Sequence, residues 1–217
     1  MTLTRPHRLS LWIKIPYTLW VIVLIPVWVH YQGWNNFLWF SDIAFLATCL
    51  ALWLESRLLA SMTAVGILLP DLAWTLHFLA DLIVDTGLLE QSGYMFNEQI
   101  PLFVRGLSLF HAVVPPLLVW MVYRLGYDGR GLAAQTLLAW LVLPACYFFT
   151  DPAESINFVS GFGEPPRPPI PQPWWLIAES ILLPVGIYLP THLLLARWFG
   201  RPACRVAGAD GNETPVK

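Results

Sequence analysis

Hydrophobic residues along the chain gather into six blocks, each close to the length that crosses a lipid bilayer. The blocks lie at 15–31, 37–54, 59–84, 102–123, 131–150 and 174–198. A transmembrane α-helix needs about 20 consecutive apolar residues, because it must cross a hydrocarbon layer about 30 Å thick. The pattern therefore predicts an all-α, polytopic transmembrane bundle of six helices within residues 1–199, followed by a polar cytoplasmic tail at 200–217.

The composition favours the same conclusion. Hydrophobic residues make up 57% of the chain and charged residues only 12%, against about 25% charged residues in ordinary soluble domains. The net charge of −2 provides no basic surface, which excludes nucleic acid as a partner. The three cysteines lie in separate segments and suggest neither a disulfide framework nor a thiolate metal site. The lipid bilayer is the expected partner, and a homo-oligomer is left open.

The basic residues predict the orientation, since Lys and Arg are retained on the cytoplasmic side during insertion. With the N-terminus inside, ten of the twelve Lys and Arg residues are cytoplasmic, and Arg105 and Arg167 lie outside. We therefore expect a multi-pass protein of a bacterial-type inner membrane with both termini in the cytoplasm. A cleaved signal peptide is the alternative for the first block, but residues 26–30 offer no small-residue cleavage site.

A proline-rich segment precedes the last apolar block. Six prolines follow Glu164 within residues 165–173, which favours an extended polyproline II conformation. This segment is interpreted either as a stiff spacer that leads to the last helix or as a cover over an outward-facing cavity. The sequence does not decide between the two.

Several predicted helices carry ionisable residues, which cost roughly 2.5–3.5 kcal/mol each at the centre of a membrane and are therefore candidates for function. His77 and Asp81 are four residues apart and share a helix face, and Asp71 follows Pro70 near the middle of the same block. Pro115 and Pro116 have no N–H to donate, so they should free the carbonyls of the residues four positions earlier, one of which is His111.

These residues lead to the following assignments. The candidate catalytic residues are His77, Asp81, His111 and Ser108; the candidate substrate-binding residues are Arg105, Asp42 and Glu179; the candidate ligands of a divalent metal are His77, His111 and Asp81. His77 and His111 are predicted at equal depth on neighbouring helices, which would make one shared site. The guanidinium of Arg105 suits a carboxylate or phosphate, so the leading hypothesis is an outward-facing intramembrane pocket that binds an anionic small molecule or lipid headgroup.

Other interpretations use the same residues. A metal-dependent intramembrane hydrolase would use the histidines to hold a cation, and a small proton-linked transporter would use the titrating groups to gate ion movement. An accessory subunit would need no site, and the ionisable groups would then pair with one another to lock the bundle. The sequence leaves open whether the protein is an enzyme and what its substrate is.

Two short stretches carry a resemblance to known sequences. Asn36-Phe-Leu-Trp-Phe-Ser-Asp42 and Arg105-Gly-Leu-Ser-Leu-Phe-His111 resemble uncharacterised bacterial polytopic integral membrane proteins, and that resemblance implies no activity. The alkaline ceramidase and progestin-receptor-like hydrolases place Ser-x3-His, an Asp and a late His-x3-His around zinc. This chain has Ser108-x2-His111 and a single His192 in the last block, so no residue role is transferred from that family.

Overall fold

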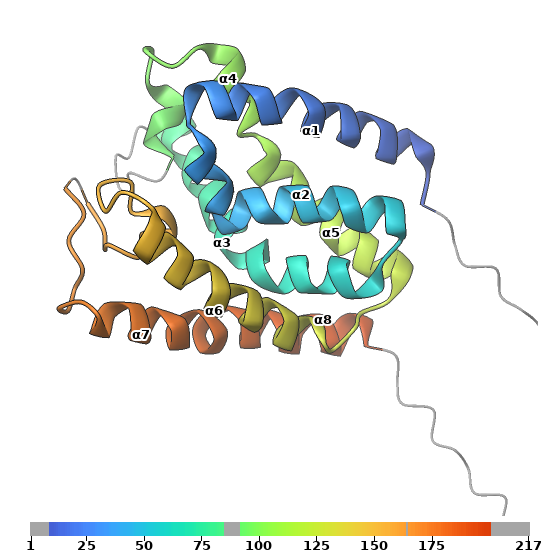
Figure 1. The fold of residues 1–217 in the computed structure, drawn as a ribbon. Helices are drawn as coiled ribbons and strands as arrows, with labels where there is room; N and C mark the ends of the chain where they lie inside the picture. Colours follow the sequence, from blue (N-terminus) through green and yellow to red (C-terminus); the bar gives the residue numbers. More distant parts are fainter. Residues whose placement is uncertain (1–8, 85–91, 164, 201–217) are drawn as a thin grey trace, which may run out of the picture.

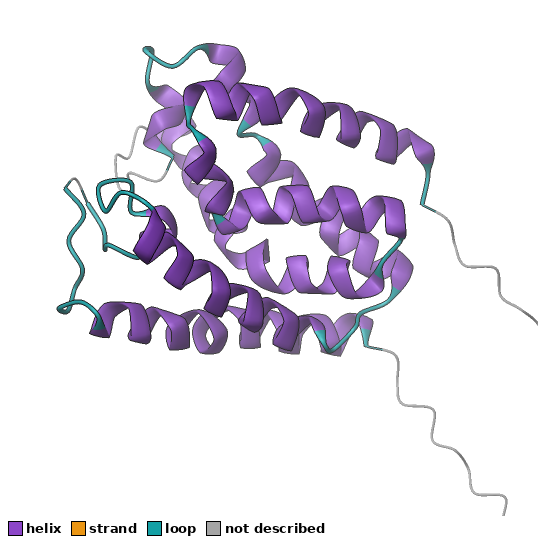
Figure 2. Ribbon diagram, viewed as in Figure 1, coloured by secondary structure: helices purple, strands orange, loops and turns teal. Residues whose placement is uncertain are grey.

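Helices account for all the regular structure in the part of the chain that the computed structural model describes, residues 9–84, 92–163 and 165–200 (Figure 2). Every predicted block forms helix: α1 (Leu11–Tyr31), α2 (Phe40–Leu54), α3 (Arg57–Val84), α4 (Leu102–Leu107) with α5 (Phe110–Leu125), α6 (Gly131–Phe149), and α7 (Trp174–Leu182) with α8 (Leu189–Phe199). The all-α class is thus confirmed. The predicted tail lies, apart from Gly200, outside the described residues.

Five of the spans are long and apolar enough to cross a membrane, which fits a membrane protein. The exception is α2, which has 15 residues where the sequence predicted a helix over 37–54. It begins late because residues 34–38 form a separate 3₁₀ turn, η1 (Trp34–Leu38), and the N–H of Phe40 donates to Oδ1 of Asn157 at 2.9 Å. That cap comes from a residue 117 positions away, so no local pattern could indicate it.

The two ends of the bundle differ in the segments that they carry (Figure 1). The start of α1 and the end of α8 lie together at one end, here called the terminal end. The connections at 92–101 and 151–173 lie at the opposite end, the loop end. Helix α3 is central, because it packs against α2, α5 and α6 and also contacts α8.

Two spans are interrupted where the sequence predicted continuous helices. Between α4 and α5, the N–H groups of Ser108 and Leu109 donate to carbonyls three residues earlier, at 3.0 and 3.2 Å, which tightens the chain into a turn. Between α7 and α8, residues 183–188 form a π-helical turn, η4 (Leu183–Tyr188). Such wide turns occur frequently at functional sites.

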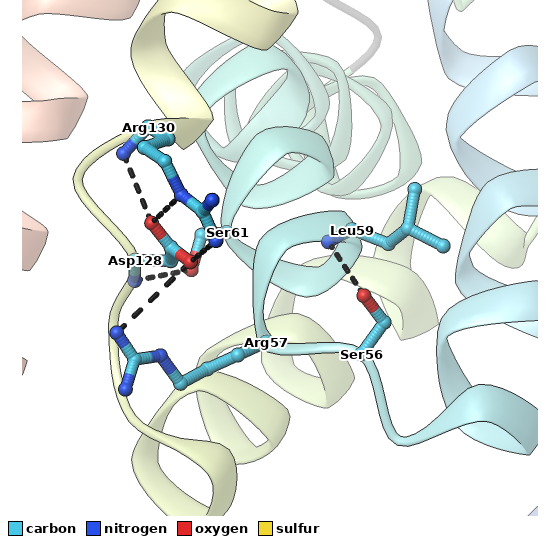
Figure 3. A network of polar contacts seen from close by, with 6 residues as sticks. All are labelled: Ser56, Arg57, Leu59, Ser61, Asp128 and Arg130. Atoms are coloured by element: carbon cyan, nitrogen blue, oxygen red, sulfur yellow. Dashed lines mark hydrogen bonds and ion pairs between the residues drawn. The ribbon is translucent and has the colours of Figure 1, made fainter.

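Polar contacts close the terminal end (Figure 3). Asp128, in the connection between α5 and α6, accepts from Nε and Nη2 of Arg130 at 3.1 and 2.8 Å. Its backbone N–H donates to Oγ of Ser61 at 2.9 Å, which ties this connection to α3. Nearby, Nζ of the buried Lys14 lies 2.7 Å from Oε1 of Glu55. Both of these acids, Glu55 and Asp128, therefore have basic partners.

Candidate functional site

A cavity of about 490 Å³ lies between α2, α3 and the α7–η4 span. Its volume falls within the range typical of small-molecule sites. Aromatic side chains form much of its wall, namely Trp39, Phe40, Phe158, Phe162, Trp175 and Tyr188. Two carboxylic side chains, Asp71 of α3 and Glu179 of α7, also line it. The cavity therefore combines an aromatic, largely apolar surface with two acidic groups.

One wall is built by the loop that follows α6, and this loop is held in an uncommon backbone conformation. Ser155, Asn157 and Phe158 have φ values of 40°, 54° and 67°, in the left-handed region that costs energy for residues other than glycine. The Asn157 side chain holds this conformation, since Nδ2 donates to the Leu38 carbonyl at 2.8 Å while Oδ1 accepts from Phe40. Asn157 thus both lines the cavity and holds the backbone of this loop.

The proline-rich segment is hydrogen-bonded to the loop that forms this wall. Nε2 of Gln172 donates to the Val159 carbonyl at 2.6 Å, and the backbones of Phe162 and Arg167 bond to each other. Nε1 of Trp175 donates to the Phe158 carbonyl at 2.9 Å. Residues 157, 158, 162 and 175, which line the cavity, lie on either side of the prolines in the sequence. The proline-rich segment therefore connects and supports two parts of the cavity wall.

Glu179 is the more isolated of the two acidic groups. Glu179 is only 6% exposed, and no described residue provides a hydrogen-bond partner for its Oε2. Among the described residues, no Lys or Arg forms an ion pair with it. An unpaired polar atom in an apolar site costs free energy, and an unpaired charge costs more. Glu179 is therefore a candidate for a functional residue.

Asp71 is shared between the cavity and a histidine. Its Oδ1 lies 3.1 Å from Nδ1 of His111, whereas Oδ2 is buried and has no hydrogen-bond partner in the described part of the chain. The His111 ring lies against the rings of Trp74 and Phe110, with centroid distances of 4.5 and 4.2 Å. The His111 carbonyl, which the sequence predicted to be freed by Pro115, accepts from Oγ1 of Thr75 at 3.2 Å.

The structure gives two members of the predicted shared site of His77, Asp81 and His111 partners from outside that group. His111 faces Asp71, which lies six residues before His77 on α3, and Asp81 accepts instead from Oγ of Ser92 at 3.1 Å. The predicted depths were counted along one straight helix, whereas the chain turns at Ser108 before α5 begins. Among the described residues, which include all three predicted metal ligands, no group of three or more His, Cys, Asp or Glu side chains could hold a metal ion.

The remaining predicted residues have other neighbours. Nη1 of Arg105 donates to the Met95 carbonyl at 2.8 Å, so this side chain anchors the 92–101 connection to α4. Asp42 accepts from Nε1 of Trp28 at 2.9 Å, and Ser108 is buried at the turn between α4 and α5. Of the seven predicted site residues, Glu179 lines the cavity. Anion binding by Arg105 stays a prediction.

Two parts of the cavity wall, the tryptophans and Asp71, were not among the site residues predicted from the sequence. Trp39 and Trp175 both line the cavity. Tryptophans near the ends of apolar blocks are typical of a membrane interface, so their local sequence did not indicate a cavity. The sequence did contain a signal for Asp71, because the preceding residue, Pro70, has no N–H to donate to the Gly66 carbonyl. Gly66, Pro70 and Asp71 all line the cavity in the structure. A proline beside a mid-helix acid was therefore the better guide than the His-x3-Asp spacing.

A smaller polar cavity of about 270 Å³ adjoins this region at the loop end. It is lined by Tyr31, Gln32, Asn36, Trp39, Glu154 and Ile156. Trp39 lines both cavities, so this residue borders the polar space as well as the apolar one.

Comparisons with protein-family models, with curated proteins and with solved structures find no match to this chain. The chemistry of the cavity is therefore the basis for its function. Carboxylate oxygens and aromatic faces both attract positive charge, the first by direct pairing and the second through the negative face of the ring.

Proposed function

We propose that this protein is an integral protein of the inner membrane, with both termini in the cytoplasm, whose intramembrane cavity binds a cationic organic molecule with an apolar body. The observation that carries the proposal is that two buried carboxyl oxygens on one aromatic cavity, Asp71 Oδ2 and Glu179 Oε2, have no hydrogen-bond partner among the residues that the structure describes. The membrane assignment is supported by the five apolar spans and the orientation by the distribution of Lys and Arg.

The sign of the ligand's charge follows from the lining. Asp71 already has the His111 imidazole on one side, which leaves Glu179 as the acidic group without a counter-charge. A positive ligand would supply that counter-charge, whereas an anion would add repulsion in a medium of low dielectric constant. The cavity thus favours a cation over the anion predicted from Arg105, whose side chain is engaged with the Met95 carbonyl.

The aromatic wall narrows the ligand class further. An ammonium group gains about 0.5–2 kcal/mol from contact with an aromatic face, depending on how far it is desolvated. The volume of about 490 Å³ is far larger than a metal ion requires. An amine or quaternary ammonium compound that carries an alkyl or aromatic body meets both conditions.

The proposal can be tested with two probes of similar size and opposite charge. Purified protein in a non-ionic detergent is titrated calorimetrically with benzyltrimethylammonium and, separately, with benzenesulfonate. We expect saturable binding of the ammonium and at least tenfold weaker binding of the sulfonate. Equal affinity for the two probes, or preferential binding of the sulfonate, would contradict the proposal. Preference for the sulfonate would instead favour the predicted anion binding by Arg105.

A further inference from the structure

Glu179 and Asp71 differ in how their charge is neutralised when the cavity holds no ligand. The carboxyl group of Asp71 lies beside an imidazole that can carry a balancing proton, at 3.1 Å. Glu179 has no such neighbour among the described residues. The titratable groups around it are Cys146 of α6, Tyr188 of η4 and Asp71 of α3, and none of them supplies a positive charge in its ordinary protonation states.

A bare carboxylate in these surroundings is unfavourable, because the apolar wall replaces neither the water nor a counter-ion. A proton on the carboxyl group removes the charge without requiring a partner. A bound cation also compensates the charge, by pairing with the ionised form. The proton and the organic cation therefore compete for the same oxygen atoms.

Resting on the proposed function, we infer that the cavity is a cation–proton exchange site, in which the arrival of one monovalent organic cation expels one proton from Glu179. The O–H bond of the Glu179 carboxylic acid breaks, the proton leaves to water, and the carboxylate pairs with the ammonium group. The net charge of the occupied cavity then equals that of the empty one. No electron transfer and no further reactant is involved.

The Asp71–His111 pair has a different part in this exchange. Oδ1 of Asp71 lies 3.1 Å from Nδ1 of His111, and the His111 ring is stacked against the rings of Trp74 and Phe110, so each member of the pair already has its neighbours. The other ionisable groups near Asp71 are Asp42, Tyr17 and Tyr94. Asp42 is held by Trp28, and the Tyr17 hydroxyl donates to the Phe45 carbonyl at 2.9 Å. The pair thus acts as a fixed electrostatic partner, and the exchanging proton belongs to Glu179.

The exchange is tested on the purified full-length protein with benzyltrimethylammonium, whose charge does not change with pH. Protons released on binding are counted with a pH indicator in weakly buffered solution, and the affinity is measured across the pH range in which the protein stays folded. We expect close to one proton per bound cation at the acidic end, with an affinity that rises about tenfold per pH unit there and levels off at higher pH, as linkage requires.

Variants identify the group that gives up the proton. Glu179→Gln should bind the probe at least tenfold more weakly and release no proton, whereas His111→Gln should still release one, as should the control His77→Gln. Binding without proton release and without pH dependence would overturn the exchange while leaving the proposed function standing. Release that persists in Glu179→Gln but is lost in His111→Gln would assign the proton to the Asp71–His111 pair and overturn the inference. Absence of any binding would instead reject the proposed function.

Discussion

The terminal end and the cavity differ in whether their acidic groups have partners. At the terminal end, Nζ of Lys14 lies 2.7 Å from Oε1 of Glu55, and Asp128 accepts two bonds from the Arg130 guanidinium. At the cavity, Glu179 Oε2 and Asp71 Oδ2 are buried without partners among the described residues. Paired groups satisfy one another and hold the helices together, whereas unpaired groups leave hydrogen-bonding capacity for something that the chain does not supply. The contrast separates residues that maintain the fold from residues available to a ligand.

The largest effect is expected where a buried pair is broken. Glu55→Ala would leave the ammonium of Lys14, which is 7% exposed, without its counter-charge, and would also remove the acceptor for the Leu9 N–H. Breaking a buried pair from one side costs about 3–5 kcal/mol, so the unfolding temperature in detergent should fall sharply. The control Glu154→Ala removes an exposed acid and should change stability little. Equal effects would show that pairing at the terminal end does not stabilise the bundle.

A medium effect is expected at the interruption beside His111. Thr75→Val removes the hydroxyl that lies 2.7 Å from the Asp71 carbonyl and 3.2 Å from the His111 carbonyl, and the loss of this hydrogen bonding should cost about 0.5–1.5 kcal/mol. Thr150→Val is the matched control, because the Cys146 carbonyl that it serves also accepts the Thr150 N–H at 3.1 Å. In chemical denaturation, Thr75→Val should therefore have a lower free energy of unfolding than Thr150→Val. The reverse order would show that the Thr75 hydroxyl is not needed for stability.

A smaller, pH-dependent effect is expected at Asp128. Hydrogen bonds from Arg130 hold the pKa of the Asp128 carboxyl below its ordinary value, so its contribution to stability is complete above about pH 4 and is lost as the pH falls further. Because Arg130 is largely exposed, Asp128→Asn should cost only about 0.5–1 kcal/mol at pH 7. The difference from the unmodified protein should shrink below about pH 4 in thermal unfolding.

A control for this pH effect is Ser61→Ala. It removes the acceptor of the Asp128 backbone N–H, and it should lower the stability by the same amount at about pH 7 and at about pH 3. A difference between Asp128→Asn and the unmodified protein that stays constant from about pH 7 to pH 3 would show that the ion pair with Arg130 carries no stability.

The helices could be predicted from the sequence because hydrophobic length is a local property. Each of the six apolar blocks contains helix in the structure. The site could not be predicted in the same way, because the interruptions at Ser108 and Leu183 set which side chains meet. The Asn157 cap on α2 and the His111–Asp71 contact join residues 117 and 40 positions apart. Such contacts depend on how the helices pack, which the spacing of His77 and Asp81 does not encode.

The central claim is that the unpartnered carboxyl group of Glu179 serves a ligand rather than the fold, and one variant measured in two ways tests it most directly. Glu179→Gln is compared with the unmodified protein and with Glu154→Gln, which removes an exposed acid at the loop end. Thermal unfolding without ligand and calorimetric titration with benzyltrimethylammonium are carried out on the same samples.

We expect Glu179→Gln to unfold at the same temperature as the unmodified protein or higher, since it loses no partner, and to bind the ammonium at least tenfold more weakly. Glu154→Gln should match the unmodified protein in both measurements. A marked loss of stability in Glu179→Gln with unchanged ammonium binding would contradict the account, because Glu179 would then be a structural residue like those of the terminal end.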